Sequence, residues 1–242
     1  MKYSPRSVKL CNNLGIAYLN AGRRADAAAM YKKSIEADPN NAAAYGNLAT
    51  IYRDEGKFEK AIELYKKALE IAPYDTGKAN PFYTDAYQGY NQLGIAYCYA
   101  GKYAEAIGPF KKVLEANPRD VSAYTNLGNA YNSMGKKEEA MELFKKAIEI
   151  NPNIPEPYNN LANVYASTGK LEEAVNLYKK AIEINPRFAE AYNSLAAIYA
   201  NSGRREEAVA AFKKALEINP DYADARRNLE IVSGGSKQEA PQ

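Results

Sequence analysis

Apolar and small side chains recur along this chain with the spacing of amphipathic helices, and the same pattern returns at regular intervals. In residues 121–154 a first stripe occupies block positions 4, 7, 8 and 11: Tyr124, Leu127, Gly128 and Tyr131. A second stripe occupies positions 20, 24, 27 and 28: Ala140, Phe144, Ala147 and Ile148. Because residues three or four apart share one side of a helix, each stripe predicts one helix. The pattern therefore predicts two helices in each block.

Prolines and glycines divide the chain into blocks of 34 residues. A proline that ends the second helix recurs six times: Pro39, Pro73, Pro118, Pro152, Pro186 and Pro220. The intervals are 34 residues, except for one of 45 that contains an 11-residue insertion. A glycine falls at position 15 of every block, between the two helices: Gly22, Gly56, Gly101, Gly135, Gly169 and Gly203. We expect a tight turn there, since glycine readily adopts the left-handed conformation that such turns require.

The blocks account for nearly the whole chain and leave no room for a second domain. Six repeats are predicted, at 8–41, 42–75, 87–120, 121–154, 155–188 and 189–222, with the insertion at 76–86. Residues 1–7 form an N-terminal lead. Residues 223–232 form a cap helix, in which Arg226 and Arg227 replace apolar side chains. The polar tail, residues 233–242, is expected to be disordered.

One repeat carries a full set of residues typical of a known family: Tyr158, Leu161, Ala162, Tyr165, Gly169, Ala174, Tyr178, Ala181 and Pro186. With the 34-residue period, these residues resemble the tetratricopeptide repeat, position for position. The chain departs from the family pattern at Cys11, where an aromatic residue is usual, and at Ser34 and Val113, where alanine is usual. The resemblance implies an all-α, right-handed superhelical solenoid of helix-turn-helix repeats with a concave groove for protein partners.

The composition argues against several kinds of site and partner. The chain has no histidine and only two, distant cysteines, so it lacks a histidine base, a zinc ligand set and a disulfide framework. We therefore expect no enzymatic activity, no catalytic residues, no metal and no cofactor. The net charge of +3 argues against a nucleic-acid partner, and no apolar run approaches the ~20 residues of a membrane span. We expect a cytoplasmic protein, or a periplasmic one if an export signal was removed.

Lysine doublets recur at positions 25 and 26 of the repeats, as at Lys145 and Lys146. A glutamate follows the first lysine four residues later, as Glu149 follows Lys145. We therefore expect ion pairs between residues i and i+4 on a solvent-exposed helix face, rather than a nucleic-acid surface.

The first helix of each repeat has a face opposite its apolar stripe, which carries positions 2, 6, 9 and 13. We call it the amide face, because position 6 holds mainly amide side chains: Asn13, Asn47, Gln92, Asn126, Asn160, Ser194 and, in the cap helix, Asn228. Position 9 adds Asn129 and Asn163. In tetratricopeptide arrays this face lines the groove.

Two interpretations of this row of amides remain open. An amide donates and accepts hydrogen bonds at once, so the row can hold the backbone of an extended peptide. It is similar to the asparagine ladder in the tetratricopeptide half of O-linked N-acetylglucosamine transferase. Alternatively, the amides only form bonds between adjacent helices, or they reflect duplication of the repeat.

Aromatic residues gather beside the insertion, which is the one interruption of the array. Asn80 and Pro81 are typical of a helix start, so we expect the first helix of repeat three to begin early. Four aromatic residues near this junction are candidates for partner binding: Phe82, Tyr83, Tyr87 and Tyr99. Such side chains are favoured at interfaces, since they are rigid and amphipathic. They predict a hot spot at the junction of repeats two and three, or extra turns that pack on repeat two.

The sequence thus favours a non-catalytic adaptor or assembly scaffold that binds an extended peptide or a partner helix in its groove. The alternative is a structural homo-oligomer, in which repeat one, which has no cap, stacks on another copy of the chain.

Overall fold

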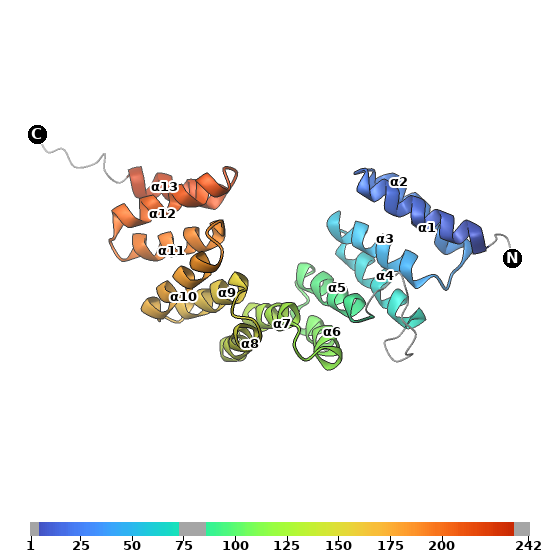
Figure 1. The fold of residues 1–242 in the computed structure, drawn as a ribbon, viewed down its shortest axis with the longest axis horizontal. Helices are drawn as coiled ribbons and strands as arrows, with labels where there is room; N and C mark the ends of the chain where they lie inside the picture. Colours follow the sequence, from blue (N-terminus) through green and yellow to red (C-terminus); the bar gives the residue numbers. More distant parts are fainter. Residues whose placement is uncertain (1–4, 73–85, 235–242) are drawn as a thin grey trace, which may run out of the picture. The chain divides into compact units, whose positions relative to one another are not determined.

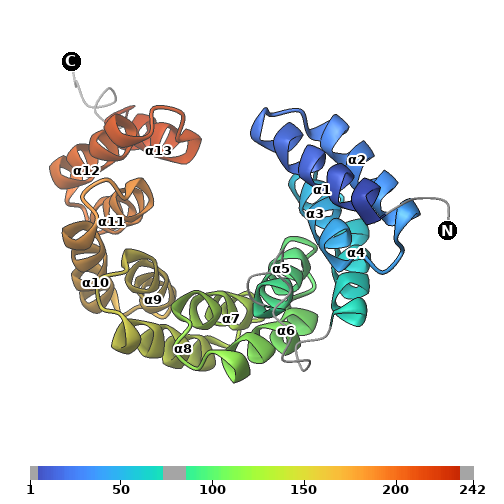
Figure 2. The same cartoon turned by 45° about the vertical axis from the view of Figure 1, so that its right-hand side comes forward.

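The structure is a computed structural model that describes residues 5–72 and 86–234, and these residues form thirteen α-helices and no strand. The chain divides into two compact units, Met1–Ala130 (unit 1) and Tyr131–Gln242 (unit 2). The helices of each unit follow one another in chain order (Figure 1). In unit 2, α9 and α11 form one layer, and α8, α10 and α12 form the other (Figure 2).

The helices pair as the sequence pattern predicts, with one short and regular turn inside each pair. Unit 1 contains α1 Pro5–Asn20, α2 Arg24–Ala37, α3 Ala42–Asp54, α4 Phe58–Ile71, α5 Ala86–Tyr99 and α6 Tyr103–Ala116. Helix α7, Val121–Ser133, begins in unit 1 and ends in unit 2. Unit 2 continues with α8 Lys137–Ile150, α9 Pro155–Ser167, α10 Leu171–Ile184, α11 Ala189–Asn201, α12 Arg205–Ile218 and α13 Ala223–Gly234. The fold is therefore an all-α solenoid of helix-turn-helix repeats.

An aromatic residue at position 24 lies at the centre of each repeat's core. All six of these side chains are at most 2% exposed: Tyr31, Tyr65, Phe110, Phe144, Tyr178 and Phe212. In repeat three the ring of Phe110 lies so close to Gly94 that a Cβ atom on this glycine would be 2.6 Å from it. The glycine thus leaves space that the aromatic ring fills, which explains a small residue at position 8 of the first stripe.

The turn inside each repeat depends on its glycine. Gly169 has φ +82°, and two hydrogen bonds from the turn close the end of α9. The Lys170 N–H donates to the Tyr165 carbonyl at 2.9 Å, and the Gly169 N–H donates to the Ala166 carbonyl at 3.2 Å. This is a Schellman motif, which satisfies carbonyl groups that the helix end leaves unpaired. The glycines at the same position of the other five repeats have φ between +72° and +76°.

The residue after this glycine is always Lys or Arg, a regularity that the sequence patterns above do not include. In five repeats its cation lies 4.1–5.7 Å from the ring of the tyrosine at position 11: Arg23 on Tyr18, Lys57 on Tyr52, Lys136 on Tyr131, Lys170 on Tyr165 and Arg204 on Tyr199. Repeat three differs. There the Lys66 Nζ atom of repeat two lies 5.7 Å from the centroid of the Tyr97 ring, and Lys102 forms an ion pair with Glu59. The position-11 tyrosines therefore serve the scaffold, through cation–π contacts as well as burial.

The lysine doublets make different ion pairs from those expected. The second lysine pairs with the glutamate three residues on, as Lys146 pairs with Glu149 at 2.8 Å. Lys145 pairs instead with Glu142, one turn earlier, at 3.4 Å. The predicted (i, i+4) pairing was wrong because the i+3 neighbour lies equally close on a helix surface. These pairs are exposed, so each contributes little to stability.

Both ends of the array extend slightly further than predicted. Helix α1 begins at Pro5, inside the predicted lead, because proline is well tolerated in the first turn of a helix. Helix α13 continues through Ser233 to Gly234, two residues into the predicted tail, and the Ser233 carbonyl accepts a hydrogen bond from Arg205 at 3.0 Å. The rest of that tail lies outside the described residues, as does the predicted early helix start at Asn80 and Pro81.

Candidate functional site

The amide face is the part of the first helices that the core leaves accessible. The position-6 side chains are half-buried, except that of Asn13, which is exposed. Asn129 and Asn163 at position 9 are exposed. The apolar residue at position 7, next to the amide, is at most 5% exposed in five repeats: Leu48, Leu93, Leu127, Leu161 and Leu195. The face therefore presents polar groups from a rigid, packed helix.

Several of the position-6 side chains bond to neighbouring helices. Asn126 Nδ2 donates to Asn91 Oδ1 at 3.4 Å, and Gln92 Oε1 accepts a hydrogen bond from Arg53 of repeat two. Ser194 bonds to the hydroxyl of Tyr178. These three residues thus make bonds between adjacent helices, which is the kind of contact that the alternative interpretation expects.

Other amides of the row have side-chain groups left for a ligand. Within residues 5–72 and 86–234, the side chains of Asn13, Asn47 and Asn228 make no hydrogen bond. Asn163 uses its Oδ1 atom to accept a 2.5 Å hydrogen bond from Tyr178. Burial raises the pKa of Tyr178 to about 12, so its hydroxyl stays protonated and donates this bond. The Nδ2 group of Asn163 takes no part in the bond.

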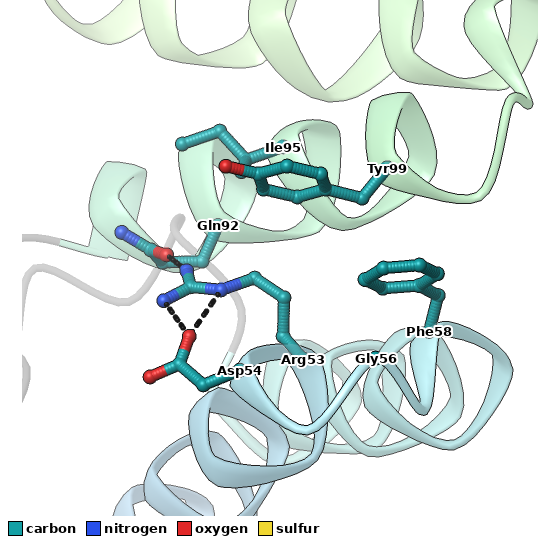
Figure 3. A pocket seen from close by; sticks show the side chains of 7 residues that line it. All are labelled: Arg53, Asp54, Gly56, Phe58, Gln92, Ile95 and Tyr99. Atoms are coloured by element: carbon teal, nitrogen blue, oxygen red, sulfur yellow. Dashed lines mark hydrogen bonds and ion pairs between the residues drawn. The ribbon is translucent and has the colours of Figure 1, made fainter. Parts of the chain in front are cut away.

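A pocket of about 550 Å³ opens between repeats two and three, on the amide face of unit 1. Its lining side chains and backbone come from the end of α3, the turn into α4, and α5: Arg53, Asp54, Gly56, Phe58, Gln92, Ile95 and Tyr99. Figure 3 shows Tyr99 and Ile95 on one side of this space and Arg53 and Phe58 on the other. We call this site the junction pocket.

The polar side of the junction pocket is held by a chain of hydrogen bonds. Arg53 donates from Nε and Nη2 to one oxygen of Asp54, Oδ1, at 3.0 and 2.7 Å. Its Nη1 atom donates to the Gln92 Oε1 atom of the next repeat. The Arg53 side chain is only 18% exposed, so the ion pair with Asp54 holds it in place more firmly than a surface pair would.

Two aromatic rings line the junction pocket from opposite sides, the exposed Tyr99 and the half-buried Phe58. The rings of Phe58 and Tyr99 stack with 5.6 Å between centroids and 11° between planes. Tyr99 is nevertheless 63% exposed, among the largest exposures of any large apolar side chain in the described residues. An exposed ring that is fixed by stacking loses little entropy when a partner binds to it.

The aromatic candidates of the sequence fall differently in the structure. Tyr99 lies in the junction pocket. Phe82 and Tyr83 lie outside the described residues, and of Tyr87 the structure describes the backbone in α5 alone. The sequence interpretation missed Arg53, Asp54, Phe58 and Ile95. Arg53 did carry a signal, since position 12 holds uncharged residues in the other five repeats.

The environment of Cys98 disfavours its reactive thiolate form. Cys11 and Cys98 are both free, and burial raises the pKa of Cys98 to about 11, which disfavours its thiolate. Across the described ranges, no group of three or more Cys, Asp or Glu side chains is placed to hold a metal ion. No helix in the same ranges is both long and apolar enough to cross a membrane.

Family models of the tetratricopeptide repeat match most of the chain. Models described as "TPR repeat" or "Tetratricopeptide repeat" match residues 12–76, 94–135, 121–154, 143–176, 162–203 and 189–222. Two of these segments, 121–154 and 189–222, have the bounds of the fourth and sixth blocks of the sequence. Among curated proteins, none matches the chain.

Solved structures of repeat proteins resemble the chain over nearly their full lengths. A crystal structure of MamA is 32% identical to this chain, with a TM-score of 0.57. The match covers 73% of this chain and 96% of the MamA chain. YrrB, described as "a TPR protein with an unusual peptide-binding site", is 26% identical, with a TM-score of 0.53. The match covers 81% of this chain and 96% of the YrrB chain. TTC0263 of Thermus thermophilus, at 24% identity, covers 79% and 98% with a TM-score of 0.65, and it supports the fold alone.

Proposed function

Because this chain belongs to the tetratricopeptide repeat family, a family of protein-interaction scaffolds, we propose that it is a non-catalytic adaptor that binds an extended peptide along its amide face. The observation that carries the proposal is that Asn13 and Asn47, at position 6 of adjacent repeats in unit 1, use none of their side-chain hydrogen-bonding capacity within the described residues. A solvated asparagine in mid-helix is unfavourable for helix stability, so a row of them is better explained by a ligand than by the scaffold.

A peptide backbone matches this row chemically. Each peptide group offers one donor and one acceptor, and an amide side chain can pair with both. Such pairing demands little of the ligand's sequence, which suits an adaptor. The similarity to YrrB, whose described peptide-binding site belongs to a protein of the same repeat type, supports this class of ligand.

Site-specific photocrosslinking tests the proposal. A benzophenone side chain replaces Asn47 on the amide face or, as a matched control, the exposed Lys111 on the second helix of repeat three. We expect Asn47 to capture one defined partner segment and Lys111 to capture none. That segment, synthesised as a peptide, should bind about thirtyfold more weakly to the Asn13→Ala, Asn47→Ala double variant, because each of the two lost hydrogen bonds is worth about 1 kcal/mol. Equal capture at both positions, or unchanged affinity of the double variant, would contradict the proposal.

A second candidate function, self-association through repeat one, rests on a different observation. Leu14 at position 7 is 38% exposed, although the leucines at this position in the next five repeats are nearly buried, and Leu10 is 58% exposed. Among the described residues, no helix precedes α1 to cover these side chains. Light scattering at rising protein concentration should then show a mass above that of the monomer. The Leu10→Glu, Leu14→Glu variant should return it to the monomer mass, and a wild-type protein that is monomeric throughout excludes this function.

A further inference from the structure

The junction pocket combines polar and apolar groups, whereas the row of amides around it is polar alone. We propose that it is a subsite for an uncharged aromatic side chain of the bound peptide, with the peptide backbone held by Gln92 and Asp54. The inference rests on the proposed peptide-binding function and adds to it a place and a sequence preference.

The orientation of Gln92 is the first step of the argument. Its Oε1 atom is occupied by Arg53, so the side-chain amide is fixed and its Nε2 atom points away from the guanidinium group (Figure 3). Within the described residues this nitrogen has no hydrogen-bond partner. Gln92 therefore presents donors only, and a backbone carbonyl oxygen of a ligand is the matching acceptor.

Asp54 supplies the complementary group. Both of its hydrogen bonds from Arg53 end on Oδ1, so the Oδ2 atom has no partner within the described residues and remains an acceptor. A peptide N–H is a matching donor for this oxygen. A fixed donor on one helix and a fixed acceptor on the next fit the two sides of an extended backbone.

The shape and surface of the apolar wall favour an aromatic ring. Tyr99 and the aliphatic Ile95 lie on one side of the space, and Phe58 and the planar guanidinium group of Arg53 lie on the other (Figure 3). A flat side chain can stack on an aromatic face and on a guanidinium plane, whereas an aliphatic side chain gains binding free energy only from the apolar area that it buries. The volume of about 550 Å³ accommodates such a ring together with its backbone.

The charge of the junction argues for an uncharged ligand. Each cation near the pocket already has a carboxylate partner: Arg53 with Asp54 at 2.7 Å, Lys57 with Glu55 at 2.6 Å and Lys102 with Glu59 at 3.5 Å. The hydrogen bond from Lys57 to Glu55 also raises the pKa of Lys57 and keeps it protonated. With its charges balanced, the site offers no net attraction to an acidic or a basic side chain.

A heptapeptide series tests the inference with the full-length protein. The peptides are capped at both ends, with serine and glycine around a central phenylalanine, leucine, aspartate or lysine, and binding is followed by ¹H–¹⁵N chemical-shift titration. We expect the phenylalanine peptide to bind most tightly and to shift amides at residues 53–58 and 92–99. Tyr99→Ala should weaken it about fivefold, whereas Asn201→Ala, at the same repeat position of repeat six, should leave it unchanged.

Each other outcome overturns the inference. Equal binding of all four peptides, tighter binding of the lysine or aspartate peptide, no binding of the phenylalanine peptide, or unchanged affinity of Tyr99→Ala would do so. Tyr99 is exposed, so this variant should fold, which circular dichroism checks. The two proposals fail separately: if the crosslinked segment binds wild type and Tyr99→Ala equally, only the subsite is wrong. If the phenylalanine peptide binds at the junction but Asn13→Ala, Asn47→Ala has no effect on the segment, only the amide row is wrong.

Discussion

Two junctions of the array share a backbone design and differ in the side chains that it displays. At the junction of repeats two and three the key side chains are an arginine, two stacked rings and an oriented glutamine. At the junction of repeats five and six, the equivalent positions hold small, aliphatic or amide residues: Ala166, Ser167, Leu171, Ser194, Ala197 and Asn201. Both junctions keep the positive-φ glycine and the buried position-24 aromatic residue. The difference shows that the side chains on display can change at a few surface positions while the scaffold stays constant.

The largest expected effect tests the constancy of the scaffold. Phe110→Ala and Phe212→Ala each remove a ring at most 1% exposed from the second repeat of one junction. Each should lower the free energy of unfolding of its region by about 3–5 kcal/mol, since both leave a cavity of similar size. Urea unfolding followed by circular dichroism measures the loss. A difference above about 2 kcal/mol between the two variants would mean that the junctions are not equivalent scaffolds.

Moving the pocket chemistry from one junction to the other should create a second site. The substitutions are Ala166→Arg, Ser167→Asp, Leu171→Phe, Ser194→Gln, Ala197→Ile and Asn201→Tyr. Because the backbone positions correspond, calorimetric titration with the phenylalanine peptide should change from one site to two. The new site should gain about 1–2 kcal/mol of binding free energy from ring stacking and hydrogen bonds. A stoichiometry that stays at one in a folded variant would show that more than these side chains defines the pocket.

A smaller effect concerns the hydroxyl groups of the position-24 tyrosines. Tyr65 bonds to Thr50 at 2.9 Å and Tyr178 to Asn163 at 2.5 Å, in the first repeat of each junction. Tyr65→Phe and Tyr178→Phe should therefore each lose about 1 kcal/mol of stability. The hydroxyl of Tyr31 in repeat one is buried without a partner among the described residues, so Tyr31→Phe should cost nothing or add stability. Thermal unfolding checks the set, and equal losses for all three variants would contradict this explanation.

The smallest expected effect separates Cys98 from its counterpart Ala200. Burial raises the pKa of the Cys98 thiol to about 11, above its ordinary value of 9.0. The folded protein therefore retains a proton that the unfolded chain loses, and stability should fall as the pH rises from about 9 to 11, with no effect near neutral pH. Cys98→Ala should remove that part of the loss. Alkylation of Cys98 by iodoacetamide should accelerate up to about pH 11, and a plateau near pH 9 would contradict the shift.

The sequence predicts the scaffold well because each of its rules acts within one repeat. The stripe positions, the turn glycines and the aromatic residue at position 24 recur six times and depend on local helix geometry. The errors are also local: Pro5 extends α1, and the lysines pair at i+3. Such differences arise where two nearby geometries have almost the same energy.

The candidate site is less predictable, because its chemistry depends on contacts between repeats. Tyr99 stands out in the sequence as an aromatic residue on the amide face. The contact that orients Gln92 joins residues 39 positions apart and depends on the conformation of a long arginine side chain. Stacking of Tyr99 on Phe58 likewise needs the spacing between α4 and α5. A search for residues that break the repeat pattern would have identified Arg53, although not the role of its partners.

The most direct test of the account is the contact between a bound aromatic ring and the junction pocket. A filtered nuclear Overhauser spectrum of ¹³C-labelled protein with the unlabelled phenylalanine peptide reports which protein protons lie near that ring. The account predicts contacts from the ring to the Ile95 methyl groups and to the Tyr99 ring. Contacts to the exposed Ile231, which lines another pocket on the amide face of unit 2, with none to Ile95 and Tyr99, would contradict it.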